Sequence, residues 1–200
     1  MSKSKYLANV EAWFKNIEDT AAAEPNPHRK AILLNYLEHA ALEYSDRWEE
    51  IFTPERTVEH PVYQVKWGTP DVVVYDGMDS VKAFYAGLKD QGVLTDQDEY
   101  LSVGDWGFSS FLNICIFMPG QQLIDGGTTV DDPDAMYVVM QPTGMYWLYD
   151  ERARLIGERV FEIAPPKIIE CAPEDVVTEA DIETLIAPYL PEPANAPATV

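Results

Sequence analysis

The sequence predicts an α+β protein whose helices pack on one face of a curved sheet. Apolar residues recur at helical spacing through much of the first 90 residues, whereas most strand-like runs, rich in aromatic and β-branched residues, follow residue 99. Helices followed by antiparallel strands are typical of the α+β class. With 200 residues and a hydrophobic content of 46%, the chain can bury a core without a disulfide or metal.

Three longer helices and one short helix are predicted before residue 90. The first covers residues 5–18, and the second begins after Asn26, which can cap it, with Pro27 at the first helical position. A short helix over residues 46–52 and a longer one over residues 80–89 follow. The buried face of the second helix is expected to consist of Leu33, Tyr36, Leu37, Ala40 and Tyr44.

Strand-like runs alternate with turn residues through the rest of the chain. The runs lie at residues 57–61, 71–75, 100–103, 108–118, 135–141, 145–149 and 154–161. Residues 142–144 and 150–153 are predicted hairpin turns. A small helix is expected after Pro166, where Thr178 and Asp181 can form a capping box.

Charge and cysteine content exclude several classes of function. Thirty-four acidic against 14 basic residues give a formal net charge of −20, which disfavours binding to nucleic acid and to anionic membranes. Cys115 and Cys171 do not form a disulfide or zinc framework, so no metal site is expected. The chain lacks a signal peptide and an apolar run long enough for a membrane span, and we expect a cytoplasmic protein.

His60 and Tyr36 are the candidate catalytic residues. A histidine titrates near neutral pH, and Pro61 restricts the backbone of His60 to an extended conformation. Tyr36 lies on the buried face of its helix, where a phenol can donate a hydrogen bond to a developing oxyanion. Read singly, each residue also fits a structural role, as a strand-end histidine and a core tyrosine. His28 and His39 are expected at the surface.

A further set of polar and aromatic residues is expected to bind the substrate. Asn113 stands among aromatic residues on one face of its strand and can anchor a polar group, or can satisfy an edge backbone group instead. Glu158 lies inside a strand, where it can orient His60 or act as an acid if it faces the pocket, although a cross-strand pair with an arginine is the expected arrangement. The predicted binding residues are Tyr44, Tyr63, Tyr100, Trp106, Asn113, Met145, Trp147 and Glu158.

Three segments resemble the SnoaL-like enzyme branch of the nuclear transport factor 2 superfamily. They are IFTPERTVEHP (residues 51–61), GMDSVKAFYAGL (77–88) and MYWLYDERARLIGERVFE (145–162), in the order found in that superfamily. The first segment is similar to the V-E-D-P pattern of ketosteroid isomerase, whose catalytic aspartate corresponds here to His60. The oxyanion-hole tyrosine of that family falls on Tyr36, and its second, protonated aspartate falls near Met145, which is not an acid.

This resemblance implies a cone-shaped α+β barrel, with a curved antiparallel sheet wrapped around three helices and an apolar pocket between them. It divides the chain into an N-terminal helix with linker (1–25), a cone domain (26–165) and a C-terminal extension with a flexible tail (166–200). A histidine base is similar to scytalone dehydratase and other eliminating members of the superfamily. The superfamily also includes bacterial lyases that eliminate water and formaldehyde from lignin-derived diaryl compounds, and the aromatic-rich lining expected here suits such a substrate. We therefore expect a cofactor-independent lyase for a bulky, hydroxylated aromatic molecule, as a homodimer or homotrimer. An isomerase, a polyketide cyclase or a non-catalytic binding module stays open.

Overall fold

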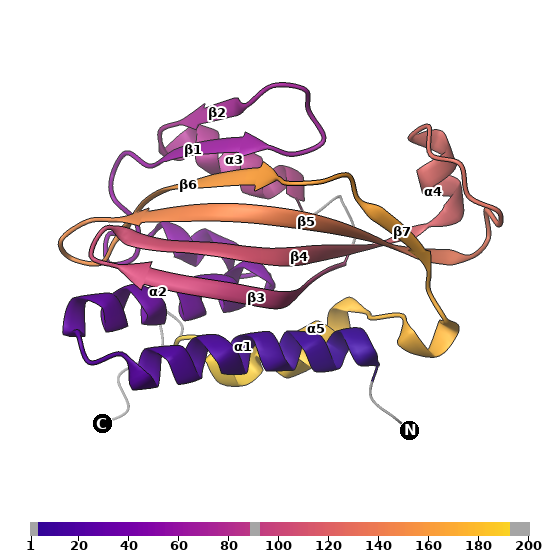
Figure 1. Ribbon diagram of the computed structural model, residues 1–200. Coiled ribbons are helices and arrows are strands. Elements are labelled where there is room, and N and C mark those ends of the chain that lie inside the picture. The colour runs from indigo at the N-terminus through magenta and orange to yellow at the C-terminus, as the bar shows by residue number, and fades with distance from the viewer. Residues whose placement is uncertain (1–3, 89–92, 193–200) are drawn as a thin grey trace.

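The computed structural model describes residues 4–88 and 93–192 and confirms the predicted α+β class. One mixed sheet is formed in the strand order β2-β1-β6-β5-β4-β3, and β7 pairs with one end of β5. Helices α1, α2 and α5 lie on one side of this sheet, and α3 lies behind β1 and β2 (Figure 1). The end that carries α4 projects from the body (Figure 1).

The helices agree closely with the periodicity of the sequence. Their bounds are α1 (Lys5–Ala23), α2 (Pro27–Glu43), η1 (Trp48–Phe52), α3 (Met78–Leu88), α4 (Gly120–Asp125), η3 (Pro173–Asp175), α5 (Glu179–Ile186) and η4 (Ala187–Tyr189). The predicted cap of α2 is present, because the Asn26 side chain accepts hydrogen bonds from the backbone N–H groups of His28 and Arg29. The capping box of α5 between Thr178 and Asp181 is also present.

Several strands are longer than the runs that the sequence predicts. Their bounds are β1 (Val62–Lys66), β2 (Val73–Asp76), β3 (Leu94–Gly104), β4 (Gly107–Pro119), β5 (Met136–Tyr149), β6 (Leu155–Glu162) and β7 (Lys167–Glu170). The β1–β6 pair is parallel, and the other pairs are antiparallel. The first strand begins at Val62 rather than Thr57, which forms only an isolated bridge to Leu155.

The predicted hairpin turn at residues 142–144 is wrong, because β5 runs straight through it. Strand β5 pairs with β6 from Thr143 onwards and with β7 from Tyr137 to Met140. Pro142 therefore lies where β5 exchanges one partner for the other, at a position where a missing N–H donor is tolerated. The turn at residues 150–153 is found, with Ala153 in the left-handed region at φ 57°.

A bulge in β3 turns two acidic residues toward the interior. The register between β3 and β4 shifts between Gln97 and Tyr100, and Asp98 adopts φ 58°. In a regular strand, Asp96 and Glu99 would point to opposite faces because side chains alternate. The extra residue of the bulge lets both of them face the helices.

The terminal segments contribute to the same core as the central one. Phe14 of α1 stacks on Tyr189 with ring centroids 4.8 Å apart, and Tyr6 packs edge-on against Phe117 of β4 at 5.2 Å. Cys115 and Cys171 are buried free thiols. The division at residues 25 and 165 and the predicted oligomer stay predictions, and residues 193–200 of the predicted tail lie outside the described residues.

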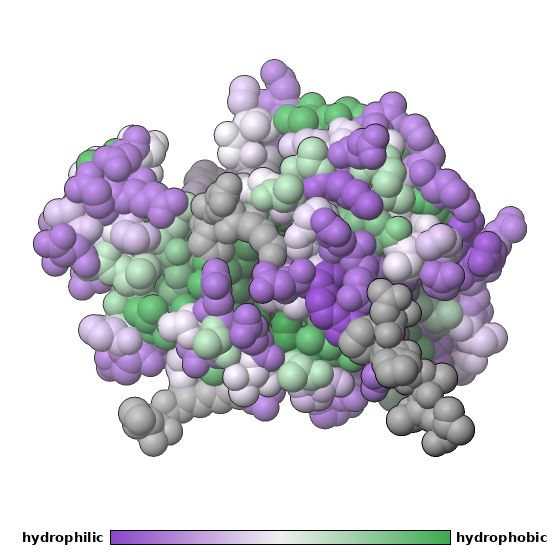
Figure 2. Space-filling view, turned by 180° about the vertical axis from the view of Figure 1, so that it is seen from behind, coloured by the Kyte–Doolittle hydropathy of each residue, from purple (hydrophilic) through white to green (hydrophobic). Residues whose placement is uncertain are grey.

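Hydrophilic residues are spread over the face shown in Figure 2, with hydrophobic residues between them.

None of the helices in residues 4–88 and 93–192 has the length and hydrophobicity that a transmembrane span requires.

Candidate active site

A cavity of about 420 Å³ lies between the sheet and helices α2 and α3. Its apolar walls include Tyr36, Ala40, Val65, Phe84, Ile114, Met145, Trp147 and Val160. More exposed lining residues mark its mouth, between α3 and the β1–β2 hairpin, and these are Trp67, Thr69, Val73, Ala83 and Gly87. Three carboxyl groups, those of Glu43, Asp96 and Glu158, also line this otherwise apolar space.

Helix α2 directs one face into the cavity. Tyr36, Ala40 and Glu43 stand at helical spacing i, i+4 and i+7, so they lie one above another on the same side of the helix. His39 lies next to this stripe and is 1% exposed. The expectation that His39 lies at the surface is therefore wrong, because the sheet covers that side of α2 as well.

Glu43, His39 and Glu158 form a compact cluster with Tyr85 of α3. The Nε2 atom of His39 is 3.7 Å from Glu43 Oε2 and 3.7 Å from Glu158 Oε1, so these two carboxyl oxygens are at most twice that distance apart. The Tyr85 hydroxyl is 2.8 Å from His39 Nε2 and donates to Glu158 Oε1 at 3.2 Å. The expected pairing of Glu158 with an arginine is wrong, because its side chain points inward and meets a tyrosine and a histidine.

Burial keeps Glu158 protonated and His39 neutral near neutral pH. Desolvation raises the pKa of Glu158 to about 8 and lowers that of His39 to about 3. For Glu43, desolvation, followed by the charges of Glu158 and Asp96, raises the pKa well above its ordinary value, although 36% of its side chain is exposed. Two neighbouring carboxyl groups with raised pKa values are a typical arrangement for exchanging one proton.

A second polar cluster lies where α1 meets β3. The Tyr36 hydroxyl donates to Glu99 Oε1 at 2.8 Å, and Trp13 Nε1 of α1 donates to Glu99 Oε2 at 2.9 Å. The Tyr44 hydroxyl donates to Asp96 Oδ2 at 2.8 Å. Desolvation raises the pKa of both Asp96 and Glu99 to about 7. The N-terminal helix thus contributes Trp13 to the cavity wall and fixes an acid behind Tyr36.

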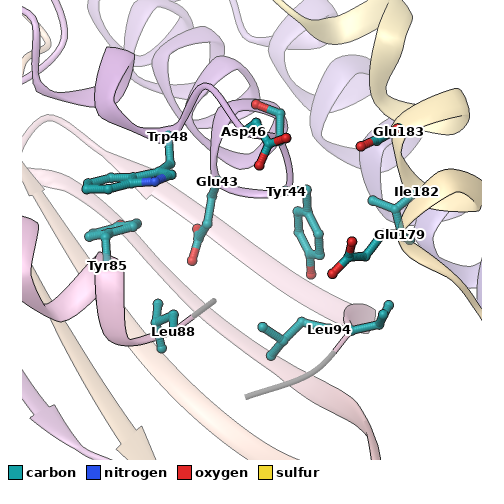
Figure 3. Close-up of a pocket in the computed structure, with 12 residues that line it drawn as sticks. Glu43, Tyr44, Asp46, Trp48, Tyr85, Leu88, Leu94, Glu179, Ile182 and Glu183 are labelled. Atoms are coloured by element: carbon teal, nitrogen blue, oxygen red, sulfur yellow. The ribbon is translucent and has the colours of Figure 1, made fainter. Parts of the chain in front are cut away.

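A smaller hollow adjoins the cavity on the side of α5. It measures about 180 Å³ and shares Glu43, Leu88 and Leu94 with the larger cavity. Figure 3 shows the Glu43 carboxyl pointing into it between Tyr44 and Tyr85, with Trp48 stacked over Tyr85. Glu43 therefore connects the enclosed part of the site to a more open one.

The structure places His60 outside the cavity, so the prediction that it faces a common pocket with Tyr36 is wrong. Its side chain is 72% exposed, and its Nε2 atom is 2.7 Å from Oδ1 of Asp76, which is 70% exposed. His60 precedes β1, and the alternation of buried and more exposed side chains in that strand extends back to it. Pro61, Tyr63 and Val65 are buried, which leaves His60 on the opposite, outer side.

We expect His60→Ala to change turnover and stability little, by about twofold at most, because its ion pair with Asp76 is solvated on both sides. Steady-state rates and thermal melting of the two proteins check this. The surface substitution His28→Ala serves as a control. A loss of turnover on the order of 100-fold in His60→Ala alone would restore His60 as the base.

The remaining predicted binding residues divide into three groups. Met145, Trp147 and Glu158 line the cavity, as does Tyr36. Tyr44 lines the adjoining hollow, and Tyr63 is fully buried with its ring against Tyr85. Three face away from the cavity, and these are Tyr100 (74% exposed), Trp106 (47% exposed) and Asn113.

The alternation of side chains along β4 places Asn113 on the face of the sheet that is turned away from the cavity. Ile114 lines the cavity. Phe108 and Leu112 are separated from it by an even number of residues, so they lie on the same face, and both are fully buried. Asn113 therefore belongs to the other face. There it donates to Oδ2 of Asp98, across the bulge, at 3.3 Å. The predicted role as a polar anchor in the cavity is therefore wrong.

Sequence reasoning missed four of the polar groups, Glu43, His39, Asp96 and Glu99. The helical spacing from Tyr36 to Glu43 was a usable signal for the first two. Asp96 and Glu99 lie in the polar run 95–100, which carries no apolar alternation and does not resemble an inward-facing strand. In the described part of the chain no three His, Cys, Asp or Glu side chains are grouped to hold a metal ion.

The raised pKa values predict that stability falls as the pH rises. Glu158 loses its proton near its ordinary pKa of 4.5 when unfolded but near pH 8 when folded. Its contribution is complete below pH 4.5 and is lost as the pH rises through about 8, on the order of a few kcal/mol. Asp96 and Glu99 act in the same direction.

Urea unfolding of wild type and Glu158→Gln at pH 5, 7 and 9 measures this effect. Charge repulsion in a chain of net charge −20 lowers stability in both proteins, so the difference between them isolates Glu158. We expect the variant to lose less stability between pH 5 and 9. Equal losses would show that Glu158 ionises at its ordinary pKa.

The fold is similar to solved structures of low sequence identity. A protein named a SnoaL-like polyketide cyclase, from Jannaschia sp. CCS1, shares 14% identity over 70% of this chain and 90% of its own, with a TM-score of 0.49. Bal32a from a soil-derived mobile gene cassette shares 9% over 68% and 92%, with a TM-score of 0.47. SalBIII, an epoxide hydrolase/cyclase-like enzyme of pyran ring formation in salinomycin, shares 17% over 72% and 95%, with a TM-score of 0.43.

Each of these TM-scores is below 0.5, so the matches establish neither a family nor a function for this chain. No protein-family model matches the chain, and no curated protein does.

Proposed function

We propose that this protein is a lyase that eliminates water, alone or together with formaldehyde, from a bulky hydroxylated aromatic molecule bound in the cone cavity. The reaction uses acid–base chemistry of the chain's own carboxyl groups and needs no cofactor. The observation that supports it best is that Glu43 and Glu158 each place a carboxyl oxygen 3.7 Å from the same atom, His39 Nε2, and both line an apolar cavity.

The pair can supply an acid and a base at the same time. Two carboxyl groups this close titrate as a unit, so between their two macroscopic pKa values one is ionised and the other protonated. Glu158 is the more enclosed, with a side-chain exposure of 5% against 36% for Glu43. We therefore assign the protonated form to Glu158 and the ionised form to Glu43.

In dehydration, Glu43 accepts the proton of a C–H bond, whose electron pair forms the new C=C bond. The adjacent C–O bond breaks, and the leaving oxygen takes the proton of Glu158, so that water departs. When a hydroxymethyl group is present, Glu43 instead accepts its O–H proton. The C–C bond then breaks to release formaldehyde, and water leaves in the same way. After either reaction Glu43 is protonated and Glu158 ionised, with His39 Nε2 3.7 Å from an oxygen of each.

The aromatic wall suits a flat apolar substrate. Trp147 stacks on Phe108 with centroids 5.4 Å apart, and the Tyr36 ring lies 5.1 Å from that of Trp147. The Tyr36 hydroxyl donates to Glu99, so its proton reaches a ligand oxygen only if it leaves that carboxyl. Exclusion of water by these rings strengthens the contact between substrate and carboxyl groups.

Two other functions use the same features. An isomerase or cyclase would use the same acid–base pair without a leaving group, and the product distinguishes it from a lyase. A non-catalytic binding module would use the apolar cavity alone, because no turnover requires the carboxyl groups to change their charge.

A panel of β-hydroxylated aryl compounds, with and without a hydroxymethyl group, tests the proposal in metal-free buffer with a chelator. Product mass distinguishes loss of water, loss of formaldehyde and isomerisation. Turnover that disappears in Glu43→Gln supports the proposal. Binding without turnover across the panel would favour the binding module, and activity that depends on added metal or nucleotide would exclude the class.

A further inference from the structure

Asp96 lines the cavity with one of its two carboxyl oxygens unused. It belongs to β3, upstream of the bulge, and faces inward beside Ile114 of β4. Its Oδ2 atom accepts the hydroxyl proton of Tyr44 at 2.8 Å. Its Oδ1 atom is buried and has no hydrogen-bond partner in the described part of the chain.

A buried, unpaired carboxyl oxygen is costly unless a ligand pairs with it. Such an atom has lost its hydration without gaining a hydrogen bond, and the loss is larger when the group is charged. Tyr44 holds the carboxyl group in place through its other oxygen, so Oδ1 cannot turn to find a different partner without breaking that bond. Asp96 is thus oriented as a hydrogen-bond acceptor beside an otherwise apolar space.

Asp96 stands apart from Glu158, the acid of the pair, within the same cavity. Strands β5 and β4 separate β6, which carries Glu158, from β3. Three strand spacings separate the two backbones by about 14 Å measured along the sheet. A ligand that reaches both groups must therefore be elongated and carry a polar group near each end.

We propose that Asp96 is a specificity-determining residue, which binds a hydrogen-bond donor at the end of the substrate remote from Glu158. This inference rests on the proposed function for the orientation of the substrate, whereas the binding site itself does not depend on turnover. The donor is a hydroxyl group on an aromatic ring or an ammonium group, since both present a proton to a single carboxyl oxygen. A biaryl compound with one such group in the para position has the required shape.

Three probes of similar shape distinguish a hydroxyl donor from an ammonium donor. They are biphenyl, 4-phenylphenol and 4-phenylbenzylamine. Affinities are measured by quenching of tryptophan fluorescence, because Trp13 and Trp147 line the cavity. The measurement uses full-length protein carrying Glu158→Gln, so that failure of the lyase proposal leaves the binding readout intact. We expect at least one polar probe to bind 10-fold or more tightly than biphenyl, as one hydrogen bond to a buried carboxyl would give.

Variants of Asp96 then test whether this residue causes the preference for a polar probe. Asp96→Leu should remove it, with biphenyl bound at least as well as before, whereas Asp96→Asn should keep a preference for the phenol but not for the amine. Asp96→Asn retains the shape of the side chain, so it also serves if the leucine variant does not fold. The proposal would be overturned if both variants kept the preference for a polar probe unchanged. It would also be overturned if the Glu158→Gln protein bound no polar probe more tightly than biphenyl, or bound none of the probes.

Discussion

Glu158→Gln is expected to lower turnover by about 10²- to 10⁴-fold while leaving the fold intact. Glutamine has nearly the same shape and can still accept the hydroxyl proton of Tyr85, but it can neither give a proton to a leaving oxygen nor carry a charge. The loss should appear in kcat rather than KM, because Glu158 acts on the reacting atoms more than on the aromatic body of the substrate.

The matched control is Glu170→Gln, a substitution of the same kind on the exposed strand β7 of the same sheet. It should change kcat by no more than about twofold. The pH dependence provides a second readout. Wild-type kcat should fall above about pH 8, where Glu158 loses its proton. Residual activity of Glu158→Gln above one tenth of wild type would exclude Glu158 as the proton donor.

The elements of this fold could be predicted mainly where local physics decides them. Asn26 and Pro27 define the start of α2, and Thr178 with Asp181 defines that of α5, since caps depend on adjacent residues. Pro142 and Gly144 resemble a turn locally, but β5 continues because β4, β6 and β7 pair with it. Strand pairing between distant segments overrides such local signals.

The candidate site was harder to predict, because it depends on which face of a strand each side chain occupies and on the pairing register between strands. A shift of one residue along β1 exchanges the inner and outer faces, and this places Tyr63 inside and His60 outside. Similarly, the bulge at Asp98 brings both Asp96 and Glu99 inward, and no pattern of apolar residues announces it. Glu158 was predicted as a site residue, but its partners His39 and Glu43 follow from the packing of α2 on the sheet.

Gly157→Ala is expected to destabilise the protein by about 3 kcal/mol, the upper range for overpacking. Gly157 precedes Glu158 in β6, where the backbone of β1 approaches it. A Cβ atom at this position would lie 1.9 Å from the carbonyl oxygen of Val62 and 2.8 Å from its carbonyl carbon. Because these are backbone atoms, no side-chain rotation relieves the overlap, and β1 and β6 must separate. Urea denaturation measures the change.

Gly87→Ala on α3 is the matched control, since a Cβ atom there meets nothing within 4 Å and alanine favours a helix by about 0.5–1 kcal/mol. The two variants add the same methyl group, so a difference between them reports the contact between β1 and β6. This contact also positions the site, because Glu158 follows Gly157 directly and Tyr63 follows Val62. Any folded Gly157→Ala protein should therefore lose turnover as well as stability, and unchanged turnover would show that β6 moves without carrying Glu158 out of place.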